Sequence, residues 1–472
     1  MKKTNTRTLL LSGSLMVAGG TQVVSAQTNQ PYNIIYILCD DMGYGDLGCY
    51  GQEKIHTPNL DKMAEEGMRF TQHYAGCTVS APSRGSLMTG KHTGHSQVRG
   101  NYEIKPEGQF PMTADTRTIA HLFQDNNYKT GLFGKWGLGF PGSESEPVKM
   151  GFDNFYGYNC QRQAHSYYPT HLWRQSEKEV LPGNANNGRS TYSQDLVHQE
   201  VLDFIRSNKD QSFFACCTYT LPHAELAGPN DSILAMYKGK FEEVPYRNQW
   251  SYTPTEIPYA QFAAMVTRLD TYVGEIMQEL KKQGLDKNTL VMFTSDNGPH
   301  REGGANPDYF KSYGPLRGTK RDLYEGGIRV PLIAWAPEMV PAGTVSDLPC
   351  AFWDMMPTFA DMINAPKEKN TDGISFLPTL KGKKQSKKHD YLYWEFHELG
   401  GRQAIRQGDW KLIAQNVGDP QKTTFELYNL RNDIHEDNDL STQYPEIVEK
   451  MKKEMAKART ESNTFNFGRE KK

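Results

Sequence analysis

Residues 33–41 read Asn33-Ile34-Ile35-Tyr36-Ile37-Leu38-Cys39-Asp40-Asp41, and residues 33–38 form a near-continuous apolar run. Such a run predicts a strand of a parallel sheet that is covered on both faces. Similar runs occur at residues 213–220 and 290–295, and polar residues follow each of them. We therefore expect three strands of one sheet, each with polar side chains beyond its carboxyl end.

These polar strand ends are the expected place of a functional site, because ligands of open α/β sheets bind beyond the carboxyl ends of the strands. The side chains concerned are Asp40, Asp41, His223, Asp296 and Asn297. Three carboxylates and an amide in one place would repel each other unless a cation lay between them. Hard oxygen ligands favour calcium or magnesium over zinc. Taken alone, however, an Asp-Asp pair after a strand is also typical of an ordinary turn or helix cap.

Helical patterns lie between the apolar runs. Thr57 is the expected N-cap of one helix, with Pro58 at its first position. The apolar residues expected on one face of that helix are Leu60, Met63, Ala64 and Met68. A longer helix is predicted over residues 259–283, where apolar residues keep helical spacing and Gly284 follows as a stop signal. Alternating strands and helices indicate an α/β core.

The character of the chain changes after about Ala365. Residues 367–370 and 381–388 are polar and lysine-rich, and short strand-like segments follow at 391–396, 403–406 and 410–414. These segments predict a small antiparallel sheet, and residues 445–458 predict a closing amphipathic helix. We therefore expect a catalytic domain over residues 27–365 and a smaller α+β subdomain over residues 366–472.

The N-terminus has the pattern of a secretory signal peptide over residues 1–26. Lys2, Lys3 and Arg7 precede a short apolar stretch, and small residues ending at Ala26 precede Gln27. No apolar segment is long enough to span a bilayer, so we expect a soluble exported protein, periplasmic or secreted. The chain has 472 residues and a net charge of -2, which gives no indication of a nucleic-acid surface.

The seven cysteines show none of the spacings of a small disulfide scaffold. Because their number is odd, at least one of them is free or pairs with another molecule. Cys216 and Cys217 are adjacent in an apolar run, which places their side chains on opposite sides of a strand. We interpret the cysteines as small buried hydrophobic residues.

Four separated segments carry a family resemblance. They are residues 36–48 with the following 57–61, residues 80–90, residues 294–298 and residues 318–331. The second segment begins with Ser80-Ala81-Pro82-Ser83-Arg84, a short pattern that alone would be weak. In this order, over residues 33–458, the segments resemble the type I sulfatase family of the alkaline phosphatase superfamily. Within that family the chain is similar to serine-type bacterial arylsulfatases and to carbohydrate sulfatases of galactose or N-acetylgalactosamine.

The resemblance implies an alkaline phosphatase-like sandwich with a large mixed, mostly parallel sheet and a smaller C-terminal subdomain. It also implies that Ser80 is oxidised to formylglycine by a radical maturase that acts on the unfolded chain. In the family, one hydroxyl of the formylglycine hydrate attacks sulfur and the other later ejects sulfate. The expected cation is Ca²⁺, or less favourably Mg²⁺, held by Asp40, Asp41, Asp296 and Asn297 together with the modified Ser80.

The same resemblance assigns roles to further residues. Arg84 would hold the formylglycine hydrate, and Lys135 and Lys320 would bind sulfate oxygens where charge builds. His223 would lie on the leaving-group side as a candidate general acid. Without the family segments, a histidine at a strand end is better explained by a hydrogen bond to the backbone. The polar and aromatic segment 160–169 is of a kind that binds sugars, and His165 is the expected specificity residue.

One position departs from the family pattern. The family commonly has Gly-Lys-Trp-His, whereas this chain has Gly134-Lys135-Trp136-Gly137. The missing histidine commonly bonds the formylglycine hydroxyl and helps to release sulfate. Its replacement would be water or one of three histidines from elsewhere, namely His73, His92 and His95.

Two other functions stay open on the sequence. A phosphate or phosphonate ester hydrolase of the same superfamily would use Ser80 as a plain nucleophile, but such enzymes usually have more histidine ligands. A non-catalytic glycan-binding relative would keep the pocket without oxidation of Ser80. The sequence leaves open which sugar and which sulfate position are recognised, and whether action is internal or at chain ends.

Overall fold

The structure is a computed structural model that describes Met1, residues 32–247 and residues 252–468. The chain divides into two units, Met1–Gln30 and Pro31–Lys472, and the second contains all the elements described below. The predicted signal peptide lies outside the described residues, apart from Met1, and stays a prediction. Within the described part of the chain, no helix is long and apolar enough to cross a membrane.

A large mixed sheet forms the centre of the second unit, in the order β10-β2-β9-β8-β1-β7-β3-β4-β5-β6, and β11 pairs with β2. Its strands are β1 (Asn33–Cys39), β2 (Met68–Tyr74), β3 (Lys129–Lys135), β4 (Asn154–Tyr158), β5 (His171–Arg174), β6 (Glu177–Val180), β7 (Phe213–Thr218), β8 (Thr289–Ser295), β9 (Arg329–Trp335), β10 (Thr344–Ser346) and β11 (Cys350–Ala351). The central strands β8, β1, β7, β3 and β4 are parallel, whereas β9, β5 and β6 pair antiparallel. The three predicted strands are therefore neighbours at the middle of the sheet, with β1 between the other two.

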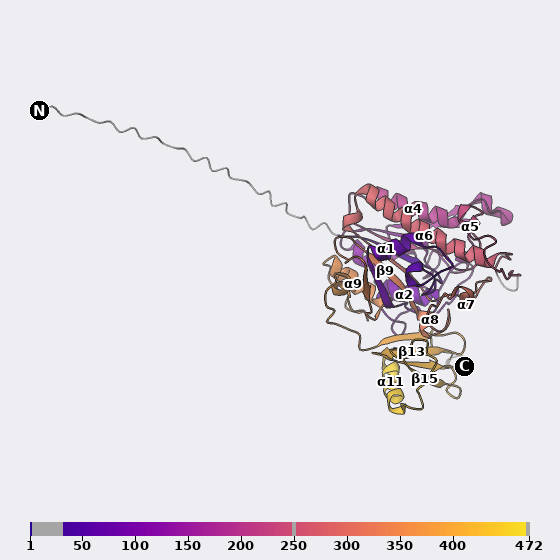
Figure 1. Cartoon of the computed structure of the whole chain (residues 1–472), viewed down its shortest axis with the longest axis vertical. Helices are drawn as coiled ribbons and strands as arrows, with labels where there is room; N and C mark the ends of the chain where they lie inside the picture. Colours follow the sequence, from indigo (N-terminus) through magenta and orange to yellow (C-terminus); the bar gives the residue numbers. More distant parts are fainter. Residues whose placement is uncertain (2–31, 248–251, 469–472) are drawn as a thin grey trace. The chain divides into compact units, whose positions relative to one another are not determined.

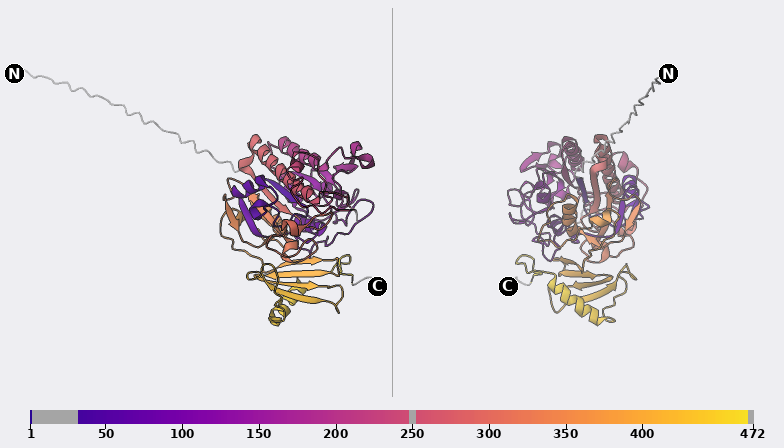
Figure 2. Two further views of the ribbon diagram at one scale, coloured as in Figure 1. Left: turned by 45° about the vertical axis from the view of Figure 1, so that its right-hand side comes forward. Right: turned by 90° about the vertical axis from the view of Figure 1, so that its left-hand side faces the viewer.

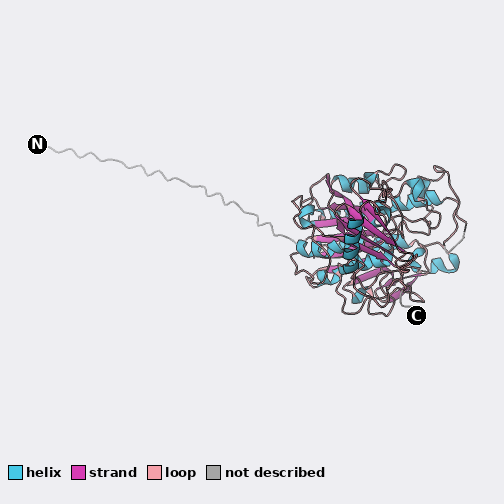
Figure 3. Ribbon diagram, turned by 90° about the horizontal axis from the view of Figure 1, so that it is seen from below, coloured by secondary structure: helices cyan, strands magenta, loops and turns pink. Residues whose placement is uncertain are grey.

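Helices cover both faces of this sheet, and Figure 3 shows the strands running between them. The helices are α1 (Pro58–Glu65), α2 (Ser80–Thr89), α3 (Ile119–Gln124), α4 (Ser193–Ser207), α5 (Ser232–Ala235), α6 (Pro258–Gln283), α7 (Pro307–Phe310), α8 (Glu325–Ile328), α9 (Met355–Met362), α10 (Leu377–Leu380) and α11 (Pro445–Lys457). Helices α1, α4 and α6 pack on one face, and α2 and α9 pack on the other (Figure 1). Helix α3 packs on the same face as α2 and α9.

The alternation of side chains in β1 explains why both faces are covered. Ile35 and Ile37 belong to the core beneath α4 and α6, and Ile34 and Leu38 belong to the core beneath α2 and α9. All four are inaccessible to solvent. Burial of each such side chain stabilises the fold by about 1.5–3 kcal/mol, so a strand with two apolar faces requires two layers of helices. Cys216 and Cys217 likewise lie in opposite cores, and all seven cysteines are free thiols.

Both helices predicted for the catalytic part are present, but the first ends earlier than predicted. Thr57 is the N-cap of α1 and Pro58 its first residue, as predicted. The Thr57 side chain makes no cap hydrogen bond and instead accepts one from the Gly48 N–H over 2.8 Å. Helix α1 ends at Glu65, so Met68 lies in β2 and not on the helix. Helix α6 ends where predicted, with Gly284 in the left-handed conformation.

The C-terminal part forms a second, antiparallel sheet in the order β12-β13-β14-β15. Its strands are β12 (Leu392–Phe396), β13 (Arg402–Gln407), β14 (Trp410–Gln415) and β15 (Thr424–Asn429). The sequence predicted the first three but not β15, whose residues are largely exposed or half-buried and therefore lack a clear apolar alternation. Helix α11 packs on one face of this sheet (Figure 2), and the other face packs on a separate buried cluster that includes Tyr74, Ile328 and Trp353. On that inner face the Trp394 indole N–H donates to the Ala75 carbonyl over 2.9 Å.

Candidate active site

The carboxyl ends of β1 and β8 lie side by side, and hydrogen bonds join them. The Asp296 N–H donates to the Cys39 carbonyl over 3.0 Å, and the Asp41 N–H donates to Asp296 Oδ1 over 3.2 Å. Asp41 has a φ of 64°, a left-handed conformation that turns the chain sharply at the end of β1. The Asp40 N–H donates to the Leu221 carbonyl over 3.0 Å, which brings the loop after β7 to the same edge.

Two further segments lie at the same edge of the sheet, namely the loop of residues 318–327 and the segment that precedes α2. Gly298 and Gly326 are in close contact, since a Cβ at Gly298 would lie 1.9 Å from the Gly326 carbonyl oxygen. The Lys320 N–H donates to the Pro299 carbonyl over 2.8 Å, and the Arg321 N–H donates to the Thr78 carbonyl over 3.1 Å. The loop of residues 318–327 is thus fixed between the end of β8 and the segment that precedes α2.

Three buried carboxylates meet three buried cations in this place. Asp40 Oδ2 lies 2.5 Å from Lys135 Nζ, and Asp41 Oδ2 lies 2.9 Å from Lys320 Nζ. The third pair joins Arg84 to Asp296 Oδ2 through its Nε at 3.1 Å and its NH2 group at 2.9 Å. Because each charge has an opposite charge within hydrogen-bond distance, burial of the group is tolerated.

Ser80 is the first residue of α2 and lies at the centre of this cluster. Its Oγ donates to Asp40 Oδ1 over 2.9 Å, and only 2% of the residue is exposed. Val79, the N-cap of α2, gives no side-chain cap to the helix. Four residues later on the same helix, Arg84 also donates to the Lys135 carbonyl over 2.8 Å. The helix therefore presents the hydroxyl and the guanidinium together.

The pKa shifts follow from this arrangement. Burial alone would raise the pKa of Asp40, but Lys135 and the other nearby cations hold it well below its usual range. Burial, together with the charge of Asp40, raises the pKa of Asp296 to about 7 despite the opposing Arg84. The protein's own cations therefore leave Asp296 incompletely compensated.

The donor set fits a hard divalent cation. Asn297 Nδ2 donates to Asp41 Oδ1 over 2.7 Å, whereas Asn297 Oδ1 is buried without a hydrogen-bond partner among the described residues. A buried oxygen with no partner is unusual and costs about 1–3 kcal/mol. With the carboxylates of Asp40, Asp41 and Asp296 beside it, this oxygen matches the ligands that Ca²⁺ and Mg²⁺ prefer. These four residues, with the oxygen at position 80, are those that could hold the metal.

His223 lies between the carboxylates and the open side of the site. Its Nε2 is 3.2 Å from Lys320 Nζ and 3.3 Å from Asp41 Oδ2, and its Nδ1 contacts the Ala224 carbonyl oxygen. Burial lowers the pKa of His223 to about 4, although Asp41 opposes this shift. The neutral ring donates through Nδ1 to the carbonyl, so Nε2 is an acceptor that receives a hydrogen bond from Lys320.

A cavity of about 670 Å³ opens above these groups. Its lining is polar and includes Ser80, Gln161, His165, His223 and Lys320. The rings of His165 and His223 stack with centroids 4.6 Å apart. Burial, assisted by the nearby charges of Lys135 and Lys320, lowers the pKa of His165 well below its usual range, so this ring is neutral at physiological pH. The structure thus brings all ten predicted site residues to one edge of the sheet and its cavity.

Glu302 also belongs to the cavity and was not predicted from the sequence. Its carboxylate is 3.3 Å from Lys320 Nζ and 2.6 Å from Arg321 NH2, and it accepts a hydrogen bond from the Tyr252 hydroxyl over 2.9 Å. Burial would raise its pKa, but Lys320 and the other cations lower it well below the usual range. The available signal was its position in the loop after β8, six residues beyond Asp296.

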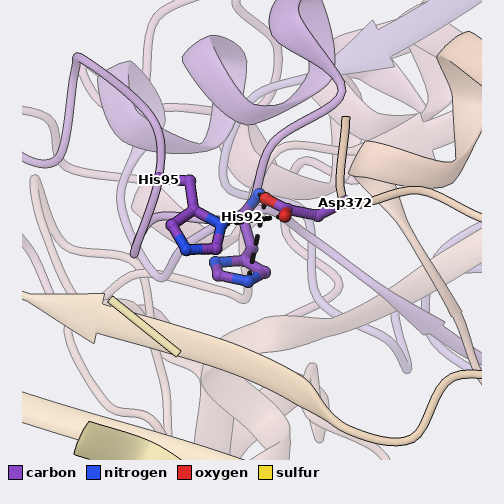
Figure 4. A group of neighbouring side chains, drawn as sticks. All are labelled: His92, His95 and Asp372. Atoms are coloured by element: carbon purple, nitrogen blue, oxygen red, sulfur yellow. Dashed lines mark hydrogen bonds and ion pairs between the residues drawn. The ribbon is translucent and has the colours of Figure 1, made fainter. Parts of the chain in front are cut away.

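His92 and His95 do not take the place of the missing family histidine. Neither lines the cavity above Ser80, and both face Asp372 instead (Figure 4). His95 Nδ1 lies 2.8 Å from Asp372 Oδ1, and the His92 backbone N–H donates to Asp372 Oδ2 over 3.0 Å. His92 Nδ1 accepts a hydrogen bond from the Gly94 N–H over 3.2 Å.

His73 likewise does not take the place of the missing family histidine. It is fully buried in β2, where its Nδ1 lies 3.4 Å from Cys350 Sγ, and it does not line the Ser80 cavity. Burial lowers the pKa of His73 to about 3. The structure therefore contradicts all three histidine alternatives as replacements for a side chain at Gly137.

Comparison with known proteins agrees with this site. A profile of the family described as "Sulfatase" matches residues 32–365, and one described as "N-sulphoglucosamine sulphohydrolase, C-terminal" matches residues 318–461. The N-acetylgalactosamine-6-sulfatase of Rattus norvegicus is 31% identical over 392 residues, which cover 78% of this chain and 69% of the relative. The arylsulfatase of Klebsiella aerogenes is 28% identical over 456 residues, which cover 80% of this chain and 95% of the relative.

Among solved structures, the crystal structure of Ps i-CgsB in complex with k-i-k-neocarrahexaose aligns with a TM-score of 0.76 and 31% identity. The alignment covers 91% of this chain and 92% of that one. The ordered motifs, the mixed sheet and these matches lead to one conclusion: the chain belongs to the sulfatase family of the alkaline phosphatase-like superfamily and is a sulfuric ester hydrolase.

Proposed function

We propose that this sulfatase removes sulfate from a galactose or N-acetylgalactosamine unit of a glycan or glycosaminoglycan, and that its nucleophile derives from Ser80. The observation that carries the proposal is the contact of 2.9 Å between Ser80 Oγ and Asp40 Oδ1 on the floor of a polar cavity. Relatives named N-acetylgalactosamine-6-sulfatase favour this sugar class. A cavity of about 670 Å³ is within the usual size range of small-ligand sites.

Oxidation of Ser80 would remove two hydrogens from its side chain and leave an aldehyde, the two hydrogens passing to a radical maturase that acts on the unfolded chain. A formylglycine hydrate carries two hydroxyl groups on one carbon, so one can bond to sulfur and the other can later expel sulfate. Asp40 is placed to accept a proton or hydrogen bond from the oxygen at this position. The NH2 group of Arg84 lies 3.6 Å from Asp40 Oδ2 and adds a second positive charge beside this carboxylate.

The proposed metal is Ca²⁺, held by Asp40, Asp41, Asp296 and the free oxygen of Asn297. Bound there, a divalent cation would lower the pKa of a hydroxyl beside it and stabilise negative charge on sulfate oxygens. The chain's own residues complete the charge balance, because Lys135 and Lys320 each donate to one of the carboxylates.

Lys320 and His223 define the side on which the alcohol would leave. Both line the cavity, and their nitrogens are 3.2 Å apart. A leaving alkoxide needs a proton, and Lys320 already donates a hydrogen bond to His223 Nε2. We propose that His223 Nε2 takes up a proton from solvent when the anionic substrate binds, because the bound anion favours the charged ring, and then gives this proton to the leaving alkoxide as general acid. His165, stacked on His223, is proposed to contact the sugar.

The proposed location is periplasmic or secreted. The pattern of residues 1–26 supports it, and the serine at position 80 is in keeping with a bacterial maturation route.

Mass spectrometry of the tryptic peptide that contains Ser80 tests the nucleophile. Protein from a host with a serine-type maturase should show the loss of two hydrogens in that peptide. Active protein with an unshifted peptide would refute the proposal, and inactive protein from a host without maturase serves as the matched control.

Turnover of matched substrates tests the reaction and the sugar. Aryl sulfate should be hydrolysed far faster than the phosphate ester of the same alcohol, and a strong preference for phosphate would support the phosphatase alternative. A panel of galactose and N-acetylgalactosamine units sulfated singly at each position should give one preferred position. No turnover of any of them, with turnover of another sugar, would refute the substrate assignment.

A further inference from the structure

The side chain of Gln161 occupies the space beside Gly137. Gly137 has a φ of +74°, and a Cβ built on it would lie 2.0 Å from Gln161 Nε2 and 3.0 Å from Gln161 Cδ. A separation of 2.0 Å is shorter than real contacts of a Cβ, so Gln161 Nε2 would have to move before a side chain could stand at position 137. A side chain at position 137 and the carboxamide of Gln161 therefore exclude each other in this arrangement.

The backbone fixes this relationship. Two hydrogen bonds continue the pairing of β3 and β4 beyond their ends, from the Trp136 N–H to the Tyr158 carbonyl over 2.9 Å and from the Gly137 N–H to the Asn159 carbonyl over 3.1 Å. The Gln161 N–H donates to Gln109 Oε1 over 2.9 Å. Gln161 thus lies in the turn that follows β4, where its backbone is tied to Gln109.

The amide nitrogen of Gln161 has no hydrogen-bond partner in the described part of the chain. Only 7% of Gln161 is exposed, it lines the same cavity as Ser80, and its Nε2 is buried without a hydrogen bond to any described residue. Buried amide groups nearly always have partners, so an unpaired one beside a polar cavity indicates a partner that the protein itself does not supply.

We propose that the Gln161 carboxamide binds the sulfate group of the substrate through an N–H donor, in the space that a side chain at position 137 would otherwise take. This inference rests on the proposed function, because it assumes that the sulfate lies in the Ser80 cavity. An amide neither gains nor loses a proton in the physiological range. The role of Gln161 is therefore to donate a hydrogen bond to negative charge, not to act as a base.

Two variants separate this role from a structural one. Gln161→Ala removes the donor, and kcat/KM for the preferred sulfate ester should fall by about tenfold to a hundredfold. Gln161→Glu keeps the shape but places negative charge beside the sulfate, so kcat/KM should fall at least about tenfold further and the inhibition constant of inorganic sulfate should rise. The melting temperature of the Ala variant should stay within a few degrees of the parent, because no internal hydrogen bond is lost.

Gln211→Glu is the matched control. Gln211 is exposed and outside the cavity lining, where its Nε2 donates to Asn208 Oδ1 over 2.8 Å. This variant makes the same change of charge and should keep the parent's sulfate inhibition constant. All variants are compared at equal formylglycine content, measured on the Ser80 peptide.

The outcomes are distinguishable. If the parent with oxidised Ser80 turns over sulfate esters and both Gln161 variants match it in kcat/KM and in sulfate inhibition, the role of Gln161 is refuted while the proposed function stands. If the parent with oxidised Ser80 turns over no sulfate ester, the proposed function itself fails. Equal losses in the Ala and Glu variants, with unchanged sulfate inhibition, would also overturn the assignment, because a donor to sulfate must be sensitive to charge.

Discussion

Asp40 connects Ser80 to Lys135, because each of its carboxylate oxygens contacts a different one of these two residues. Oδ1 accepts from Ser80, and Oδ2 accepts from Lys135. The side chain of Asp40 thus orients Ser80, the nucleophile precursor, and holds the ammonium group of Lys135, which can face the sulfate. Its burial is tolerated only because the positive charges around it keep it ionised. Lys320 donates to Asp41 as Lys135 does to Asp40, and it also lines the cavity. A substitution of Lys320 therefore tests the charge arrangement most directly.

We predict that Lys320→Ala lowers kcat/KM for an aryl sulfate by about 100-fold or more, because a donor directed at developing negative charge is lost. The fold should persist, since the loop backbone stays anchored through the Lys320 N–H and the Pro299 carbonyl. Steady-state kinetics and circular dichroism measure the two effects. Lys54→Ala is the control, because Lys54 is exposed and outside the cavity lining, and its Nζ contacts the carbonyl and ring of Tyr309. Full activity of the Lys320 variant would show that the lysine does not act on sulfate.

His165 should affect the choice of substrate more than the chemical step. Its imidazole lines the cavity and stacks on His223, and its ring nitrogens make no hydrogen bond to the described residues. We expect His165→Ala to lower kcat/KM for the preferred sulfated sugar by about tenfold or more, with a change of less than about threefold for a small aryl sulfate. His171→Ala, outside the cavity, should change neither value. Equal losses on both substrates would assign His165 to catalysis and not to specificity.

At the scale of elements, β12 joins the small sheet to the catalytic core through a buried carboxylate. Glu395 lies 3.2 Å from Arg99 of the core, 2.9 Å from His397 and 2.9 Å from Arg459. It also accepts a hydrogen bond from the Tyr393 hydroxyl over 2.8 Å. Such a network positions the loop that contains Asn101, a residue of the active-site cavity, against the small sheet. The small sheet thereby supports the catalytic edge without supplying the reacting groups.

The ionisation of Glu395 should stabilise the fold at neutral pH. Burial would raise its pKa, but the hydrogen bond from His397 and the charge of Arg99 lower it to about 2. Since the folded pKa lies below the unfolded value of about 4.3, this stability is present above about pH 4.3 and is lost as the pH falls towards 2. Glu395→Gln should therefore lower the free energy of unfolding by about 3 kcal/mol at pH 7.

Urea unfolding measures this difference across pH. The gap between parent and Glu395→Gln should narrow steadily below about pH 4.3. Glu177→Gln, at an exposed position of β6, should show no gap at any pH. A gap that stayed constant from pH 7 to pH 3 would mean that packing, not charge, accounts for the effect.

At the scale of the whole molecule, the strand ends were predictable because the signal is local. The apolar runs of β1, β7 and β8 indicated a doubly covered sheet, and the polar residues after them indicated the catalytic edge. Glu302, the contact of Gln161 with Gly137, and β15 were not predictable in the same way, although Gln161 lies in the segment 160–169 that is predicted to bind sugar. Glu302 and Gln161 acquire their roles from contacts with segments far along the chain, and β15 has half-buried residues that carry no clear period. What takes the place of a side chain at Gly137 likewise depends on the three-dimensional arrangement. The structure puts Gln161 beside Gly137, and His73, His92 and His95 lie outside the cavity lining.

Cation binding should stabilise the whole molecule, because the proposed ligands join β1 to β8 across the centre of the sheet. A ligand that binds only the folded state adds about 2.7 kcal/mol when its concentration is one hundred times its Kd. We expect Ca²⁺ added to EDTA-treated protein to raise the melting temperature by several degrees, more than Mg²⁺ does, since flexible oxygen ligands suit the larger ion. Asn297→Ala should weaken this shift, because it removes the oxygen that has no hydrogen-bond partner among the residues that the structure describes. Asp372→Asn should keep it, because Asp372 belongs to the separate cluster of His92 and His95. The opposite pattern, a shift that is lost in Asp372→Asn and kept in Asn297→Ala, would place the cation at the histidine cluster and contradict the ligand set proposed for the active site.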